Sequence, residues 1–208
     1  FNAIGVYSMD DADPDTEMTN HINFRECGAY GSAVDENISA VELMGSTDVL
    51  FEDGYSFGFG RKALEVYASL RVTVRRTVVR YDWWEGDTYK PNDPRVHMTC
   101  YNTQDSVFEN ILAFDSGPLP ISAHGIADHA GLVLSGNDAA GTAIQGSSNA
   151  GYYGSIVFAN HTPGVDSIFN GVELDGGSGD PATNLTVQDV VIWGNKSYGL
   201  NIQSNVSN

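Results

Sequence analysis

A short strand-and-turn unit recurs along this chain, and repetition of this kind constrains the fold more than any other sequence feature. Each copy opens with an apolar residue and two or three polar or small ones, continues with a short apolar run, and ends at Asp, Asn or Gly. Four copies begin at Phe51, Val74, Phe108 and Val187, and a weaker one begins at Gly154. A coil of this size cannot bury its apolar face alone, but stacked coils bury a continuous core. The repeat therefore predicts a β-solenoid.

A second, alternating strand motif lies between these units, at residues 40–44, 63–67, 96–100, 131–135, 171–175 and 199–203. Alternation predicts one inward and one outward face for each strand. The expected inward residues are Val41, Leu43, Leu64, Val66, Val96, Met98, Val172, Leu174, Leu200 and Ile202. A β-sandwich is the alternative, and it would need hairpin signals between strands of matched length. The Asp53-Gly54 and Asn170-Gly171 pairs do not lie between such strands.

Residues 72–80 and 185–195 resemble units of the pectate-lyase-like right-handed parallel β-helix superfamily. The resemblance covers about residues 36–208 and implies an all-β, single-domain parallel β-helix with loop insertions. Loops are expected at 81–95, 116–130 and 175–184, and residues 135–153 are expected to form a long loop or a poorly patterned coil. Residues 1–35 lack the repeat and are predicted to form an N-terminal cap segment, since open sheet ends need protection. The superfamily includes polysaccharide lyases, hydrolases, epimerases, adhesins and virus spikes, so function must be argued from a site.

The net charge is −17, from 27 acidic and 10 basic residues, which disfavours binding to nucleic acid or anionic lipid. Such acidity suits a salty medium or bound cations such as Ca²⁺, or simply keeps the protein soluble. No apolar run reaches transmembrane length, so membrane insertion is not expected. Together with the acidity, N-glycosylation sequons favour an extracellular or cell-surface location. The sequons begin at Asn37, Asn160, Asn184, Asn195 and Asn205.

Two cysteines, Cys27 and Cys100, leave two possibilities open. They could form one disulfide across a long loop, worth about 4 kcal/mol in the chain-entropy model. They could equally be two buried free thiols. The cysteine count alone does not settle the redox compartment.

An alternating acidic run near the N-terminus consists of Asp11, Asp13, Asp15 and Glu17. Oxygen ligands at odd spacings in a turn can surround a Ca²⁺ ion, and the run is similar to the first half of an EF-hand loop. It departs from that loop at Thr16, where a glycine belongs, and at Ile22, which cannot be a ligand. A partial calcium site and a solvated acidic segment are therefore both open.

Six of the ten basic residues lie between Arg61 and Arg80. Uronate-cleaving β-helix lyases resemble this in placing Arg or Lys against a substrate carboxylate, often with Ca²⁺. A cation stabilises the enolate-like charge that forms when the α-proton leaves. The candidate lyase residues are Arg75, Arg76, Arg80 and His97. The other interpretation is structural, with outward arginines forming ion-pair ladders with Glu65, Asp82 or Glu109 on neighbouring coils.

Aromatic side chains collect around the loop at 81–95. Exposed aromatic rings offer flat apolar surfaces for sugar rings or for a protein partner. The candidate contact residues are Tyr81, Trp83, Trp84, Tyr89, Arg95 and Tyr101. The opposing interpretation is that Trp83 and Trp84 fold back onto the flank of the solenoid.

Three functions follow from these features. The first is a non-catalytic structural component of a filament or surface layer, which the sequons, the acidity and the absence of a convincing catalytic set favour. In the sequence, a last coil begins at Leu200 and stops at Asn208, so end-to-end self-association or a longer native chain is expected. The second is a polysaccharide lyase or related carbohydrate enzyme, and the third is a glycan-binding adhesin module. We prefer the first.

Overall fold

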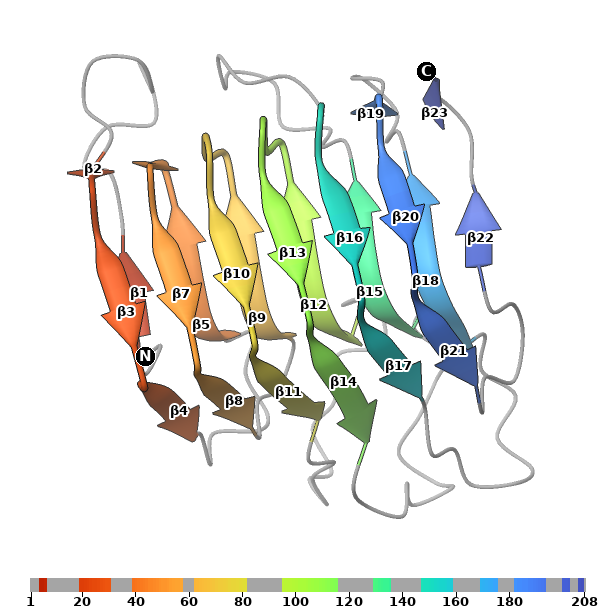
Figure 1. Cartoon of the computed structure of the whole chain (residues 1–208), viewed down its shortest axis with the longest axis horizontal. Helices are drawn as coiled ribbons and strands as arrows, with labels where there is room; N and C mark the ends of the chain where they lie inside the picture. Colours follow the sequence, from red (N-terminus) through yellow and green to blue (C-terminus); the bar gives the residue numbers. More distant parts are fainter. Residues whose placement is uncertain are drawn as a thin grey trace.

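The computed structural model describes residues 4–6, 19–30, 39–57, 62–81, 95–115, 129–135, 147–158, 169–175, 182–193, 200–202 and 206–207. Within these ranges the chain consists of short parallel strands and turns, with no helix (Figure 1). No helix long and apolar enough to cross a membrane occurs in the described part of the chain. Successive coils pass through sheets A, B, C and D in the same order.

Sheet A is the widest of the four. Its strands, in spatial and chain order, are β1 (Ile4–Val6), β5 (Ser39–Met44), β9 (Lys62–Tyr67), β12 (Arg95–Tyr101), β15 (His129–Ser135), β18 (Phe169–Asp175) and β22 (Leu200–Ile202). Sheet B is a narrow strip at the following corner. It contains β2 (Thr19–Asn20) and β6 (Ser46–Thr47), single bridging residues at Leu70, Gln104 and Ser148, and then β19 (Ala182–Thr183) and β23 (Val206–Ser207).

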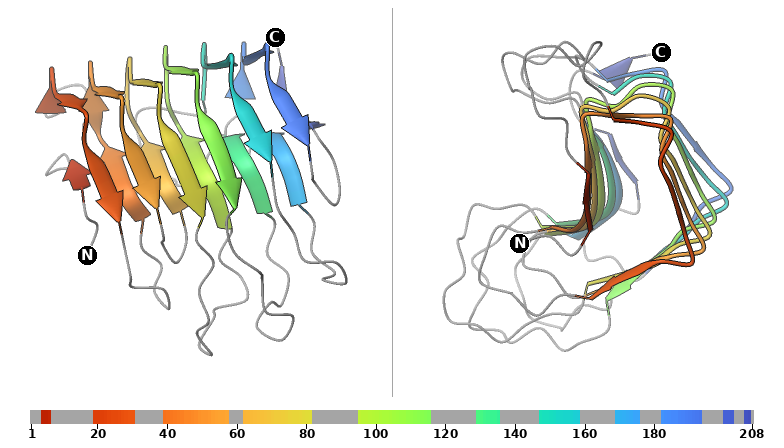
Figure 2. Two further views of the ribbon diagram at one scale, coloured as in Figure 1. Left: turned by 60° about the horizontal axis from the view of Figure 1, so that its bottom comes forward. Right: turned by 90° about the vertical axis from the view of Figure 1, so that its left-hand side faces the viewer.

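Sheets C and D each contain one strand from every described coil that passes through them. Sheet C contains β3 (Asn23–Arg25), β7 (Leu50–Glu52), β10 (Thr73–Arg75), β13 (Val107–Glu109), β16 (Gly151–Tyr153) and β20 (Thr186–Gln188). Sheet D contains β4 (Gly28–Tyr30), β8 (Tyr55–Phe57), β11 (Val78–Tyr81), β14 (Leu112–Asp115), β17 (Ile156–Phe158) and β21 (Val191–Trp193). Seen from the N-terminal end, the chain turns clockwise as it recedes, so the solenoid is right-handed (Figure 2).

The predicted repeat is the register of sheet C. Phe51 pairs with Val74, and Val74 pairs with Phe108. Tyr152 and then Val187 continue the same row. Parallel, in-register pairing confirms the right-handed parallel β-helix expected from the repeat and the superfamily resemblance, and it excludes an antiparallel sandwich. The weaker copy at Gly154 is offset, because Tyr152 and not Gly154 occupies the equivalent position.

The interior is a stack of aligned apolar side chains. Aromatic rings line the sheet C wall, with ring centroids 6.2 Å apart for Phe24 and Phe51 and 5.3 Å apart for Phe108 and Tyr152. Val41, Leu43, Leu64, Val66, Met98, Val172 and Leu174 are buried as predicted for inward positions in sheet A. Leu200 and Ile202 are instead exposed, because no described strand pairs with β22 on its far side. The side chain of Val96 lies outside the described residues.

Single residues with left-handed backbone form the corners between sheets. Between sheets B and C these residues are His21, Asp48, Arg71, Asp105, Asn149 and Asn184, with φ between 50° and 59°. Between sheets C and D they are Glu26, Asp53, Arg76, Asn110, Gly154 and Asp189, with φ between 50° and 55°. Each such corner redirects the chain within one residue, so the same sequence position repeats on every coil.

The segment predicted as an N-terminal cap contains β1 to β4. These strands pair in register with β5, β6, β7 and β8, so the described part of residues 1–35 is itself a coil of the solenoid. Strands also begin inside each of the segments expected to be loops, with β12 at Arg95, β15 at His129, β16 at Gly151 and β19 at Ala182. Residues 147–153, expected to be part of a loop or of a poorly patterned coil, contribute the Ser148 bridge and β16, and β19 lies within 175–184.

Candidate functional site

The outer face of sheet C carries a row of alternating charge. Arg25, Glu52, Arg75 and Glu109 occupy the last position of β3, β7, β10 and β13, which are successive strands. Parallel strands in register lie about 4.8 Å apart, so each of these side chains has the opposite charge on the neighbouring coil. Residues 23 to 34 positions apart in sequence, such as Glu52 with Arg75 and Arg75 with Glu109, thus become adjacent members of one ladder.

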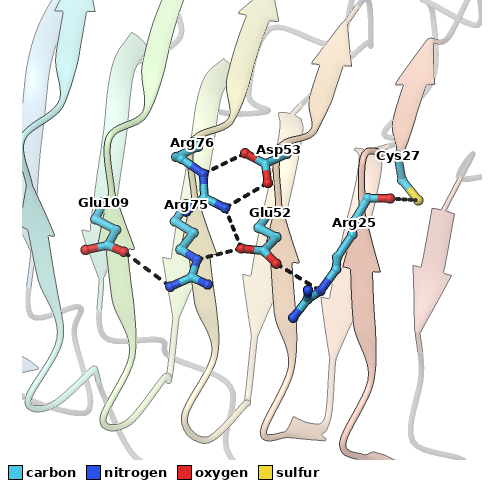
Figure 3. A network of polar contacts seen from close by, with 7 residues as sticks. All are labelled: Arg25, Cys27, Glu52, Asp53, Arg75, Arg76 and Glu109. Carbon is cyan, nitrogen blue, oxygen red and sulfur yellow. Dashed lines mark hydrogen bonds and ion pairs between the residues drawn. The ribbon is translucent and has the colours of Figure 1, made fainter.

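Glu52 is the centre of this network, shown in Figure 3. Its side chain is almost fully covered, at 4% exposure, although it lies on the outer side of the sheet. Arg25 Nε lies 2.9 Å from Oε1, and Arg75 Nε and Arg76 Nη2 lie 2.7 and 2.6 Å from Oε2. A covered carboxylate is tolerated when such partners satisfy its oxygens. Arg75 Nη1 also lies 3.9 Å from Glu109 Oε1.

The neighbouring corner adds a second contact to the same cluster. Arg76 and Asp53 are the left-handed residues that follow β10 and β7. Arg76 Nε donates to Asp53 Oδ1 at 2.6 Å and Nη2 donates to Oδ2 at 2.7 Å. This bidentate geometry is the strongest form of an arginine–carboxylate contact.

These contacts hold the cluster in its charged form. Hydrogen bonds from Arg75, and then from Arg76, lower the pKa of Glu52 below its ordinary value, against the opposing effect of desolvation. Hydrogen bonding from Arg76 likewise lowers the pKa of Asp53. The same contacts raise the pKa of Arg76. None of these groups is therefore poised to exchange a proton near neutral pH.

A second polar ladder follows the corner between sheets B and C. Arg71 contacts Asp48 at 2.6 Å (Nε–Oδ1) and 3.0 Å (Nη2–Oδ2), and His21 Nδ1 lies 3.8 Å from Asp48 Oδ2. Further along, Asn149 Nδ2 donates to Asp105 Oδ1 at 2.9 Å. The hydrogen bonds of Arg71 lower the pKa of Asp48. Like the first ladder, this one links side chains of successive coils.

The four candidate lyase residues do not form one site. Arg75 and Arg76 belong to the sheet C ladder, Arg80 lies on β11 of sheet D, and His97 lies on β12 of sheet A. The structural interpretation of Arg75 and Arg76 is confirmed, with Glu109 as one predicted partner. Glu52 and Asp53 were missed. Aligning the copies that begin at Phe51 and Val74 places Glu52 beside Arg75 and Asp53 beside Arg76, so the signal was present.

The outer face of sheet A carries a different polar patch. Leu64 and Val66 face the core, so Glu65 and Tyr67 lie on the outer side of β9. Glu65 is only 8% exposed, and its Oε2 accepts a hydrogen bond from Ser39 Oγ at 2.8 Å. Glu42 is its in-register neighbour on β5, and Tyr101 of β12 pairs with Tyr67. A carboxylate beside phenols is chemically suited to proton transfer.

The predicted glycan or partner contacts are only partly described. Tyr81 ends β11, and Arg95 and Tyr101 are the first and last residues of β12. Tyr101 is half-buried next to Tyr67, but the side chains of Tyr81 and Arg95 lie outside the described residues. Trp83, Trp84 and Tyr89 also lie outside them. The patch therefore stays a prediction.

The predicted calcium ligands Asp11, Asp13, Asp15 and Glu17 lie outside the described residues as well. Within the described ranges, no group of three or more His, Cys, Asp or Glu side chains is arranged to hold a metal ion. Calcium binding by the acidic run remains an expectation from the sequence.

The predicted Cys27–Cys100 disulfide is wrong. Both cysteines are free. Cys27 lies at the corner before β4 and Cys100 lies on β12, three coils further along the axis. Three coils correspond to about 14 Å, twice the largest Cα separation that a disulfide spans. Cys27 Sγ contacts the carbonyl of Arg25 at 3.2 Å, and the buried Cys100 Sγ lies 3.6 Å from the Tyr152 hydroxyl. Two free thiols, the other possibility, are what the structure contains.

Of the five sequon asparagines, Asn184 alone falls in a described range. It is exposed at a left-handed corner, and its Nδ2 donates to Asn149 Oδ1 at 2.6 Å. Asn37, Asn160, Asn195 and Asn205 lie outside the described residues. Glycosylation of all five stays a prediction.

No protein-family model and no curated protein matches the chain. Among solved structures, the A-module of mannuronan C-5 epimerase AlgE4 from Azotobacter vinelandii is 18% identical, with a TM-score of 0.49 over 79% of this chain and 37% of that chain. The receptor-binding domain of the siphovirus 9NA tailspike is 8% identical, with a TM-score of 0.14 over 89% and 44%. The chain spans less than half the length of either structure. The assignment of the fold therefore rests on the strand pairing itself.

Proposed function

We propose that this chain is a non-catalytic structural β-solenoid of an extracellular or cell-surface assembly. One observation carries the proposal. The arginines best suited to catalysis are paired with carboxylates of adjacent coils, in a ladder that joins successive coils through Arg25, Glu52, Arg75 and Glu109. Residues used in this way stiffen the stack and are not available to a substrate. End-to-end self-association, calcium binding and glycosylation belong to this proposal as expectations from the sequence.

Electron microscopy and an activity assay test the proposal together. Purified chain at high concentration, with and without Ca²⁺, should form rods or fibres, because stacked coils can be continued by contacts along the axis. The same preparation should give no absorbance at the unsaturated-uronate band with pectate, alginate or glycosaminoglycan. Dispersed monomers under all conditions, or turnover of any of the three polymers, would contradict the proposal.

A carbohydrate-active enzyme is the second candidate, and the environment of Glu65 favours it. This carboxylate is covered on an outer sheet face, hydrogen-bonded to Ser39, and adjacent to Tyr67. Glu65→Gln keeps the shape of the side chain and removes its basicity. If the chain turns over a polysaccharide, this variant should lose the activity while its circular dichroism spectrum is unchanged. Activity retained in Glu65→Gln would exclude Glu65 as the catalytic carboxylate, and the absence of turnover by the wild-type chain would remove this candidate function.

A further inference from the structure

A stripe of exposed and half-buried apolar side chains runs along the outer face of sheet D. In-register pairing aligns one residue from each strand, namely Tyr55, Val78, Leu112, Ile156 and Val191. The adjacent residues Ala29, Ser56, Val79 and Ala113 are buried, so the stripe occupies the outward positions. Tyr55, Ile156 and Val191 are 44%, 40% and 52% exposed, which is unusual for aligned large apolar residues.

The Tyr55 ring lies over the neighbouring coil, in the space that a side chain at Gly28 would fill. Gly28 is its register partner on β4, and a Cβ atom at Gly28 would overlap the Tyr55 ring. Glycine at this position therefore makes room for the ring over β4. An aromatic ring held against the sheet and partly open to solvent offers a flat apolar surface to stack against.

The dimensions of the stripe favour a linear ligand over a folded partner. With β4, which the Tyr55 ring covers, the stripe extends over six strands, whose spacing of about 4.8 Å gives a length of about 24 Å, and three residues per strand give a width of about 10 Å. The resulting area of about 240 Å² is well below the roughly 800 Å² per partner that a stable protein interface buries. A second copy of this chain would need much more contact surface than this face provides.

The backbone of sheet D argues against an extended peptide. The strands β8, β11, β14 and β17 are each paired on both sides, so their main-chain groups are already hydrogen-bonded within the sheet. A peptide that binds by strand addition needs an unpaired edge. The stripe itself provides apolar contact, which suits the C–H-lined face of a sugar ring, while Arg80 of β11 lies two residues after Val78 on the same outer face.

The charge around the stripe favours a neutral sugar polymer over an acidic one. The corner beside the stripe carries Glu26, Asp53 and Asp189, and its one cation, Arg76, is already paired with Asp53 and Glu52. With a net charge of −17 in addition, the surface repels polyuronates and sulfated glycans. A neutral polymer avoids this repulsion.

We propose that Tyr55, Val78, Leu112, Ile156 and Val191 bind a neutral polysaccharide chain that lies along the solenoid axis, with the Tyr55 ring as a stacking platform. The proposal adds a binding activity to the structural role and does not depend on whether the chain is catalytic. It also differs from the aromatic loop patch expected from the sequence.

Affinity electrophoresis tests this assignment. The chain is run through native gels that contain hydroxyethylcellulose, xyloglucan or galactomannan, with polygalacturonate as the acidic comparison. Retardation by at least one neutral polymer and not by polygalacturonate is expected. Tyr55→Ala should weaken the binding about tenfold, the loss of one good aromatic contact. Ile156→Asp should abolish it, since it places a charge within the stripe, between Leu112 and Val191.

Two further variants distinguish a loss of the stacking surface of Tyr55 from a general loss of folding. Gly28→Ala keeps Tyr55 but displaces its ring, so binding should fall as in Tyr55→Ala. Tyr153→Ala is the matched control, because the Tyr153 ring also lies over a glycine, Gly151 of its own strand, on sheet C and away from the stripe. Thermal melts monitored by circular dichroism confirm that every variant is folded.

Three results of the binding measurements would overturn the proposal. They are the absence of retardation by all three neutral polymers, a loss with Tyr153→Ala equal to that with Tyr55→Ala, and undiminished binding by folded Gly28→Ala and Tyr55→Ala. Sedimentation that shows a dimer which Ile156→Asp converts to monomer would also overturn it, in favour of a second copy on this face.

Discussion

Arg76 of one coil contacts Asp53 of the preceding coil through two hydrogen bonds, while both residues have left-handed backbone, with φ of 50° and 53°. Such corners usually favour glycine or asparagine, because a Cβ atom crowds the backbone there. In this chain, aligned opposite charges occupy the corner and link one coil to the next. Ladders on outer faces and at corners, and not only the apolar interior, therefore join successive coils.

The shared carboxylate of Glu52 should be the most sensitive member of the sheet C ladder. Glu52→Gln removes the charge that faces Arg25, Arg75 and Arg76, and leaves three guanidinium groups close together. Glu109→Gln is the matched control in the same row, because Glu109 has one 3.9 Å contact and its side chain is 35% exposed. The control substitution should lower the free energy of unfolding by about 0–1 kcal/mol. Urea unfolding should show a loss for Glu52→Gln that exceeds this range, and equal losses would show that the ladder does not stabilise the stack.

Acid should destabilise the protein through the same carboxylates. The pKa values of Asp48, Glu52 and Asp53 are lower in the folded chain than their ordinary values, because of hydrogen bonds from Arg71, Arg75 and Arg76 respectively. A lowered pKa stabilises the fold fully above the unfolded-state pKa of about 4 and loses that contribution as pH falls through the folded value. Melting temperature should be level from pH 7 to about 5 and fall below that. In Glu52→Gln the fall should be shallower, and an identical slope in the two proteins would contradict the assignment.

The sequence predicts the fold well because the information that specifies a solenoid is local and repeated. Copies aligned at Phe51, Val74 and Phe108 give the register of sheet C directly. The same alignment contains the Glu52–Arg75 contact, which emerges only when the polar positions of the copies are compared as carefully as the apolar ones. The cysteine pairing was not predictable in this way, because distance along the axis depends on how many coils the intervening residues form. Cys27 lies in the first coil and Cys100 in the fourth, and the residues between them include an expected loop insertion.

The two thiols should differ sharply in reactivity. Cys100 is fully buried, and burial raises the pKa of its thiol, whereas Cys27 is only half-buried. Reaction requires an accessible thiolate, so an alkylating reagent at neutral pH should label Cys27 in the folded protein and Cys100 only after unfolding. Peptide mass spectrometry identifies the labelled residue. Two unreactive cysteines that become available only after reduction would instead indicate a disulfide and contradict the separation by three coils.

Equivalent corners after sheet A provide a test of backbone strain. Gly45 and Ala68 follow β5 and β9, donate to the carbonyls of Tyr67 and Tyr101, and have φ of 58° and 46°. Left-handed backbone costs about 1–2 kcal/mol for a residue with a Cβ atom. Glycine avoids this cost but destabilises the folded state by about 0.4–1 kcal/mol, because it increases the entropy of the unfolded chain. Ala68→Gly should therefore stabilise the protein by about 0.5–1 kcal/mol, an unusual outcome for a buried alanine.

The reverse substitution at Gly45 is the control for this argument. Gly45→Ala introduces the same strain one coil earlier and should destabilise the protein by about 1 kcal/mol. Both changes are measured by urea unfolding against the wild-type chain. Opposite signs for the two substitutions would show that the corner conformation sets the energy. A loss of stability in Ala68→Gly would mean that the Ala68 methyl group contributes more through packing than its backbone conformation costs.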